Sequence, residues 1–134
     1  MLKSLRSKND IATLHGYDPT EGFLTHSTAK GYDKVFQTRE FPHKYDLIFV
    51  HMVLGGLTRT EVTENINYIK SILNKDGVLF LVEAVNDDSP RIYSKWKVYK
   101  SSDYMKETNG LIWKEAGIFI EQGQSLKIMV GRRI

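Results

Sequence analysis

The segment Tyr45–Leu57 constrains the fold of this chain more than any other. Tyr45 and Asp46 are followed by four apolar residues without alternation, and the polar residue His51 ends the run. Unbroken apolar runs of this length are typical of strands that are buried on both faces of a parallel sheet. Open α/β sheets bind their ligands just beyond the carboxyl ends of such strands. We therefore expect a functional site between His51 and Leu57.

A helix and a second buried strand follow this segment. Thr58 and Glu61 form a capping box, which marks the start of a helix. Asp76 and Gly77 then turn the chain into another unbroken apolar run, which ends at Glu83. Between these points, apolar residues recur with the spacing of a buried helix face: Val62, Ile66, Ile69 and Leu73.

The flanking residues predict the other elements of a single domain that spans residues 1–134. Asp18 is placed to cap a helix because it directly precedes Pro19. The last two strands form an antiparallel hairpin that turns at Gly123 and Gln124. In chain order, the further elements are a helix at 1–8, a strand at 11–17, a helix at 19–30, a strand at 32–38, a helix at 103–116, and strands at 118–122 and 126–131. This order predicts an α/β fold: a mostly parallel sheet with helices on both faces and an antiparallel end.

A loop is expected from Asn86 to Lys97, and it carries aromatic residues that continue to Tyr99. Tyr93, Trp96 and Tyr99 alternate there with lysines. Two interpretations stay open for these rings: a lid on the acceptor side of a site, or a cover for the edge of the sheet.

Composition and charge exclude several classes of function. The net charge of +3 comes from scattered lysines and arginines rather than from a basic patch, so nucleic-acid binding is not expected. The 4 histidines are dispersed and cysteine is absent, so no metal site is expected. The amino terminus is too polar for a signal peptide, and no apolar run approaches the roughly 20 residues of a membrane span. We therefore expect a cytoplasmic protein without membrane contact.

Several segments together resemble one enzyme family. They comprise an aspartate-led buried strand, a Leu-x-x-x-Gly turn, an acidic strand end, an Ala-Gly-Ile before the last strands, and upstream a Gly-x-Asp-Pro strand end. In this sequence they are Tyr45-Asp46-Leu47-Ile48, Leu73–Gly77, Glu83, Ala116-Gly117-Ile118 and Gly16–Thr20. The pattern is similar to the carboxyl-terminal two-thirds of class I S-adenosylmethionine-dependent methyltransferases, which have a Rossmann-like fold. The run from His51 to Thr58 most resembles the protein N-terminal methyltransferase branch.

The resemblance implies roles for particular residues. Asp18 would accept hydrogen bonds from the ribose hydroxyls of S-adenosylmethionine, a role that suits a carboxylate. His51, Met52, Val53 and Leu54 would flank the cofactor. Catalytic contacts with the acceptor would come from His51 and Glu83. Each residue also has a purely structural interpretation: Asp18 as a helix cap, His51 as a backbone hydrogen-bond partner, Met52 and Val53 as packing, and Glu83 as a capping or salt-bridge residue.

One part of the family pattern is missing. The family's first strand and its glycine-rich turn should precede Ile11 by about 20 residues, whereas ten residues precede it here and none is glycine. In the family this strand lies between the strand ending at Asp18 and the strand ending near His51. Either those strands pair directly, or a homo- or hetero-oligomer supplies the missing strand, because unpaired buried backbone is costly.

Two hypotheses about function follow. The first is methyl transfer from S-adenosylmethionine to an unidentified acceptor, by a domain that needs a partner chain if its cofactor site is incomplete. The alternative is a non-catalytic pseudo-methyltransferase subunit or binding module. An excised fragment, one half of a split protein and a degenerate paralogue are all compatible with the sequence.

Overall fold

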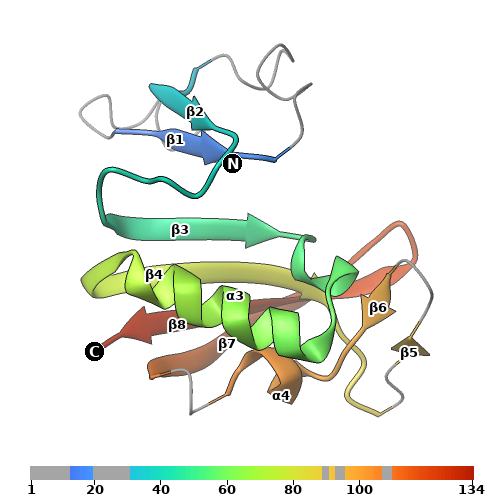
Figure 1. The fold of residues 1–134 in the computed structure, drawn as a ribbon. Coiled ribbons are helices and arrows are strands. Elements are labelled where there is room, and N and C mark those ends of the chain that lie inside the picture. Colours follow the sequence, from blue (N-terminus) through green and yellow to red (C-terminus); the bar gives the residue numbers. More distant parts are fainter. Residues whose placement is uncertain (1–12, 20–30, 89–90, 93–95, 107–109) are drawn as a thin grey trace. The chain divides into compact units, whose positions relative to one another are not determined.

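The computed structural model places the chain in two compact units, which meet in the sequence between His43 and Lys44 (Figure 1). The residues that it describes are 13–19, 31–88, 91–92, 96–106 and 110–134.

The first unit contains a parallel pair of short strands, β1 (His15–Tyr17) and β2 (Lys34–Phe36). Both lie inside the ranges that the sequence predicts, but each is only 3 residues long. The helix expected at 1–8 lies outside the described residues, as does the one expected at 19–30 apart from its first residue.

The second unit is built on a four-stranded sheet in the order β3-β4-β8-β7. Its strands are β3 (Tyr45–His51), β4 (Leu73–Ala84), β7 (Leu111–Glu121) and β8 (Gln124–Arg133). β3 and β4 are parallel, as expected, while β8 is antiparallel to both of its neighbours. The sheet therefore combines the predicted parallel pair with the predicted closing hairpin, and β3 is its last strand among the described residues. The expectation that β3 is buried on both faces is wrong, because none of its residues is buried and Leu47 is exposed.

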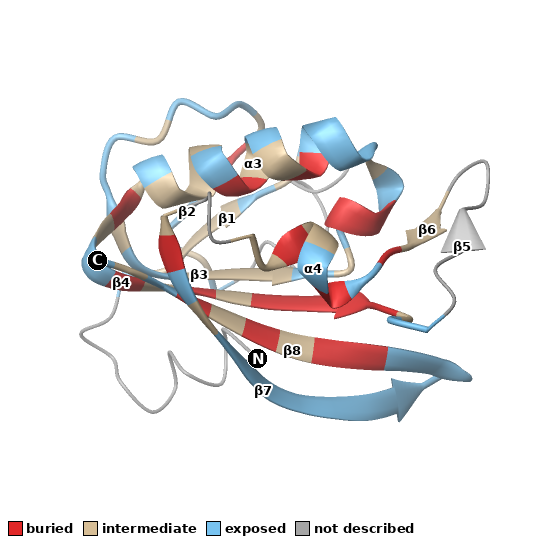
Figure 2. Cartoon of the chain, turned by 90° about the horizontal axis from the view of Figure 1, so that it is seen from below, coloured by how far each residue is buried: buried red, intermediate tan, exposed pale blue. Residues whose placement is uncertain are grey.

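Two helices cover one face of this sheet, α3 (Arg59–Ser71) and α4 (Ser101–Tyr104) (Figure 2). The predicted cap of α3 is confirmed, since the Glu61 amide donates to Thr58 Oγ1 at 3.3 Å. The Glu61 carboxylate, however, accepts from the Thr58 hydroxyl at 2.9 Å rather than from an amide.

The alternation of β4 divides the core into two apolar clusters. On the helix side, Leu79 and Leu81 pack with residues of α3 and with Met129 of β8. On the other side, Val82 and Ala84 pack with Leu126. Because successive strand residues point to opposite faces, a single strand supplies both clusters.

The helix expected at 103–116 is wrong. α4 has only 4 residues, and the chain from Leu111 onward is strand β7, which pairs with β8 over its whole length. Ile112 is exposed, whereas Leu111 is buried and Trp113 packs against the core. This period of two is that of a strand, and tertiary pairing overrides the local helix signal. Gly117 lies at an irregularity of the β7–β8 register, not at a helix end.

The hairpin is confirmed, with its turn one residue earlier than expected. Gln122 and Gly123 connect β7 to β8 with φ angles of 50° and 77°. Two consecutive positive φ values are typical of a type I′ turn, which matches the twist of the strands that it joins. In the expected loop, β5 (Arg91–Ile92) pairs antiparallel with β6 (Lys97–Val98).

Candidate functional site

The carboxyl end of β3 is fixed by an unusual backbone conformation. Met52 follows His51 with a φ of 52°, in the left-handed region that side chains seldom adopt. Its amide donates to the carbonyl of Val82 at 2.8 Å, so β3 stays attached to β4 up to this residue. The chain then leaves the sheet and forms a 3₁₀ turn at Leu54–Gly56.

A buried carboxylate from β4 caps this turn. Glu83 has an exposure of 0%, and its Oε1 accepts hydrogen bonds from the amides of Val53 at 2.9 Å and Leu54 at 2.7 Å. Oε2 has no hydrogen-bond partner among the described residues. Burial raises the pKa of Glu83 to about 7, although the backbone amides act in the opposite direction. We call Val53–Gly56 together with Glu83 the Glu83 turn.

Aromatic residues of the following segment cover the Glu83 turn. A methyl group at Gly55 would lie 2.7 Å from Cε2 of Trp96, so a larger residue there would require this ring to shift. Tyr99 is buried, and its hydroxyl donates to the carbonyl of Leu57 at 2.6 Å. Trp96 and Tyr99 therefore contact this turn and the residue that follows it, while Tyr93 lies outside the described residues.

A small pocket of about 200 Å³ opens beside the end of β3. His51 and Met52 line one side, and the tip of the β7–β8 hairpin supplies the rest, through Glu121, Gln122, Gln124 and Leu126. Nε2 of His51 lies 4.0 Å from Oε2 of Glu121, and the two side chains are 45% and 53% exposed. The pocket is therefore open to solvent, and its lining combines polar side chains with the apolar side chains of Met52 and Leu126.

The predicted site residues separate into three places. His51 and Met52 line the pocket, whereas Val53 is exposed on the Glu83 turn. Leu54 packs in the core, and both of its backbone groups are engaged. Glu83 lies in the capping position that the sequence left open as an alternative. Asp18 belongs to the first unit, where it follows β1 and its amide donates to Phe36 at 3.1 Å.

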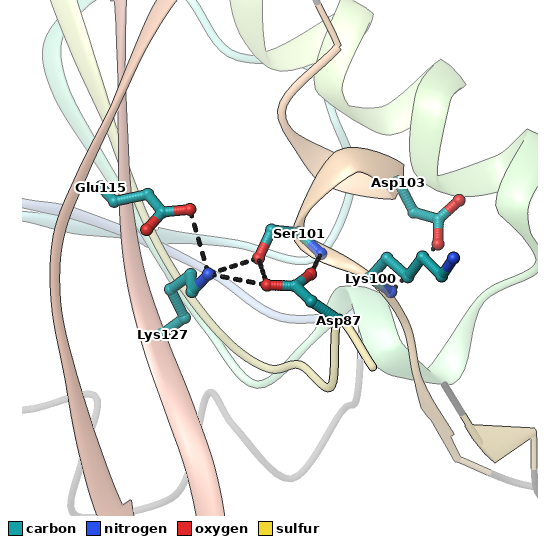
Figure 3. A network of polar contacts seen from close by, with 6 residues as sticks. All are labelled: Asp87, Lys100, Ser101, Asp103, Glu115 and Lys127. Atoms are coloured by element: carbon teal, nitrogen blue, oxygen red, sulfur yellow. Dashed lines mark hydrogen bonds and ion pairs between the residues drawn. The ribbon is translucent and has the colours of Figure 1, made fainter. Parts of the chain in front are cut away.

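The sequence did not reveal a polar cluster on the helix side of the sheet (Figure 3). Lys127 is 5% exposed, and its Nζ donates to Ser101 Oγ at 2.7 Å and to carboxylate oxygens of Asp87 and Glu115, each at 3.0 Å. The Ser101 amide also donates to Asp87 at 2.6 Å. We call these four residues the Lys127 cluster. Its one sequence signal is a lysine between two apolar residues inside a predicted strand.

The electrostatics of this cluster exclude a serine–lysine nucleophile. Burial lowers the pKa of Lys127, but hydrogen bonds and charge contacts with Asp87 and Glu115 outweigh burial and raise it overall. The pKa of Asp87 is lowered, chiefly by the Ser101 amide. Lys127 is therefore cationic at neutral pH and cannot accept a proton from Ser101. The Lys127 cluster instead joins α4 and the residues after β4 to the hairpin.

The described residues contain neither a metal-binding cluster nor a membrane-spanning helix. No group of three His, Asp or Glu side chains there is arranged to hold a metal ion. No described helix combines the length and the apolar character that a membrane span requires.

Comparison with solved structures identifies the fold as that of Rossmann-like methyltransferases. Magnesium protoporphyrin IX methyltransferase from Synechocystis PCC 6803, solved with bound SAM, has a TM-score of 0.73 and 18% identity, over 92% of this chain and 60% of that one. A 1,6-didemethyltoxoflavin-N1-methyltransferase from Burkholderia thailandensis, with S-adenosylhomocysteine, has a TM-score of 0.67 and 9% identity, over 98% of this chain and 76% of that one. The N-methyltransferase NodS from Bradyrhizobium japonicum has a TM-score of 0.68 and 16% identity, over 90% and 73%.

These identities establish the fold and not the reaction. The chain spans less than two thirds of the length of the Synechocystis enzyme. No protein-family model and no curated protein sequence matches the chain.

Proposed function

We propose that this chain is an S-adenosylmethionine-dependent methyltransferase-type domain, which transfers a methyl group to an acceptor still to be identified. The observation that carries the proposal is the pocket at the carboxyl end of β3. Ligands of open α/β sheets bind at this edge. The similar structures solved with S-adenosylmethionine or S-adenosylhomocysteine support the choice of cofactor.

The described residues fit this cofactor in part. A pocket of about 200 Å³ is smaller than the roughly 300 to 1,000 Å³ of typical ligand sites, so it holds a portion of a ligand. Asp18 stands half-buried just after a parallel strand, where a carboxylate suits a pair of ribose hydroxyls. No glycine-rich turn is present among the described residues to receive the methionine end.

The chain's own residues then have distinct tasks in the proposed reaction. The bound cofactor supplies a methyl group on a sulfonium leaving group. In the second unit, His51, Met52 and Val53 would flank the reacting end, and in the first unit Asp18 offers a carboxylate that suits ribose hydroxyls. Leu54 and Glu83 hold the Glu83 turn in its conformation. Because Glu83 accepts hydrogen bonds from the amides of Val53 and Leu54, a direct catalytic contact with the acceptor would require these bonds to break. Alignment of donor and acceptor supplies most of the rate.

A partner chain belongs to the proposal because β3 is the last strand of its sheet among the strands that the structure describes. An edge strand presents unpaired amides and carbonyls, to which a strand from another chain can add. A second copy of this chain or a different subunit would complete the cofactor site in this way.

The alternative is a non-catalytic subunit that keeps the sheet without the chemistry. It is favoured by the enclosure of Glu83, which has 0% exposure and faces backbone amides rather than a cleft. Such a protein would bind no cofactor, either alone or with a partner.

Calorimetry with S-adenosylhomocysteine on the whole chain tests the proposal. Wild type should bind, and Asp18→Asn should weaken binding by about tenfold, because it removes charge-assisted hydrogen bonds. Asp88→Asn, at an exposed aspartate of the second unit, is the matched control and should match wild type. Equal affinity in both variants would exclude the role of Asp18.

The same measurement separates the partner hypothesis from the alternative. Binding that appears together with self-association in sedimentation experiments, or only after a second subunit is added, supports an oligomeric site. A stable monomer that binds nothing under any of these conditions contradicts the enzyme proposal.

A further inference from the structure

β7 is the outermost strand on the other side of the sheet from β3, among the strands that the structure describes. All of its residues from Lys114 to Glu121 are exposed (Figure 2). Three bulky apolar residues follow one another there, with exposures of 63%, 38% and 76%: Ile118, Phe119 and Ile120. Because successive strand residues point to opposite faces, β7 exposes apolar surface on both faces. An outermost strand of this kind can pair with a strand of another chain.

The ladder between β7 and β8 fixes the spacing of the charged residues of β7. Three pairs set the scale: Ile118 with Lys127, Lys114 with Val130, and Glu121 with Gln124. The partners in the last two pairs are each three positions from Lys127, so Lys114 and Glu121 stand at equal distances on either side of Ile118. The register shift that precedes Gly117 causes this, because it adds one residue of β7 on one side only. Lys114 and Glu121 also share a face, since their partners are an even number of positions apart.

This symmetry makes β7 complementary to a second copy of itself. Antiparallel pairing of two β7 strands about a two-fold axis at Ile118 places Lys114 of each copy opposite Glu121 of the other. Within the described part of the chain, the Lys114 ammonium has no carboxylate partner of its own. Without the extra residue of the register shift, Glu115 would stand opposite Glu121, and this like-charge pair would oppose association.

The apolar residues of β7 fit the same register. Ile118 of one copy meets Ile118 of the other at the axis, and Phe119 of each copy lies opposite Gly117 of the other. A methyl group at Gly117 would have one atom within 4 Å, Cδ1 of Ile128 at 3.9 Å, so the space over this glycine is open. An aromatic ring placed opposite a glycine of the neighbouring strand covers the exposed backbone there.

We propose that this chain forms a two-fold symmetric dimer through β7, in which the two four-stranded sheets join into one. The same residues of both copies meet, so the contact closes at two chains. A strand from an unrelated protein would gain the backbone hydrogen bonds but not the reciprocal charge pairs. The dimer goes beyond the proposed methyl transfer. It is also separate from the strand addition at β3, which lies on the opposite side of the sheet.

Cysteine cross-linking of the whole chain tests the register, because the sequence contains no cysteine. In Ile118→Cys the two thiols meet at the axis, where directly opposed Cα atoms lie about 4.5 to 5.5 Å apart, within reach of a disulfide. Ile120→Cys is the matched control, because this more exposed residue lies opposite Glu115 and about 14 Å along the strands from its own copy. Mild oxidation should link Ile118→Cys at least about tenfold faster. Equal rates on non-reducing electrophoresis would overturn the proposal.

Exchange of charges tests the complementarity by sedimentation equilibrium. Lys114→Glu and Glu121→Lys each create two like-charge pairs, so each should weaken dimerisation by about tenfold or more, and the double variant should return to within about threefold of wild type. Lys75→Glu and Glu64→Lys make the same changes of net charge at exposed positions of β4 and α3, and they should dimerise like wild type. A double variant as weak as the single variants contradicts the register.

The dimer and the proposed methyl transfer fail in different measurements. Dimerisation through β7 needs no cofactor, so it is measured without S-adenosylhomocysteine. Ile118→Lys, which places two ammonium groups at the axis, should be monomeric, and circular dichroism reports whether it is folded. A wild type that stays monomeric at every concentration overturns the dimer, as does self-association that Ile118→Lys leaves intact. Neither result bears on cofactor binding, which calorimetry on the same samples decides.

Discussion

Glu83 of β4 and Lys127 of β8 lie opposite each other in the sheet, yet different kinds of partner compensate for the loss of water around each buried group. They are opposite residues in the antiparallel register, so their side chains leave the same face of the sheet. No ion pair joins them. Glu83 is held by backbone amides and keeps one oxygen without a hydrogen bond, whereas Lys127 contacts a hydroxyl and two carboxylates.

The difference shows how burial and partners set the charge of a group. The partners of Glu83 are neutral, so burial prevails and raises its pKa to about 7. The carboxylates of Asp87 and Glu115 are charged and about half exposed. They therefore stabilise the buried Lys127 ammonium while they keep part of their own contact with water. We conclude that the Glu83 turn is sensitive to pH near neutrality, while the Lys127 cluster is constant there.

The largest expected effect is a pH dependence of stability that originates from Glu83. Between about pH 5 and about pH 8, the free energy of unfolding should fall by about 2.5 kcal/mol in wild type relative to Glu83→Gln. The sign follows because the folded carboxyl binds a proton more tightly than the unfolded one, so stability is full at acid pH and is lost as the pH rises toward 7. Urea denaturation at several pH values, followed by tryptophan fluorescence, measures it. Parallel curves for the two proteins would contradict the buried acid.

A smaller effect is expected from the packing of the Glu83 turn. Gly55→Ala should destabilise the second unit by about 2 kcal/mol, because the added methyl group overlaps the Trp96 ring. Gly56→Ala is the matched control, since its nearest ring atom is 3.5 Å away, and it should stay within about 0.5 kcal/mol of wild type. Thermal unfolding of both variants compares them. Equal stability would show that Trp96 moves freely and that the turn is not tightly covered.

The smallest effect is expected from the Lys127 cluster. Lys127→Met should cost about 1.5 kcal/mol, less than a fully buried pair, because Asp87 and Glu115 are 50% and 54% exposed and regain water. Arg132→Met, which removes a surface pair with Asp76, is the control and should cost less than about 0.5 kcal/mol. Denaturation at neutral pH measures both. A loss in Lys127→Met larger than that in Gly55→Ala would reverse the order proposed for the two regions.

The fold was predictable where local pattern and tertiary pairing agree. The unbroken run before His51, the cap at Thr58 and the final hairpin each carry a short-range signal, and each is present in the structure. Residues 111–116 were predicted to be helical from their local pattern, but they belong to a strand that pairs with β8. The candidate site was predictable only in part. The end of β3 can be recognised from the sequence, whereas the hairpin residues that line the other side of the pocket cannot.

By itself, the sequence determined that a strand ends at His51, because apolar runs and turn residues are local properties. Only the tertiary structure decided that Glu121, 70 positions away, stands beside His51. It also decided that Glu83 faces two amides instead of Lys127. Such contacts depend on the curvature of the sheet and on competition among partners, which no short window of sequence records.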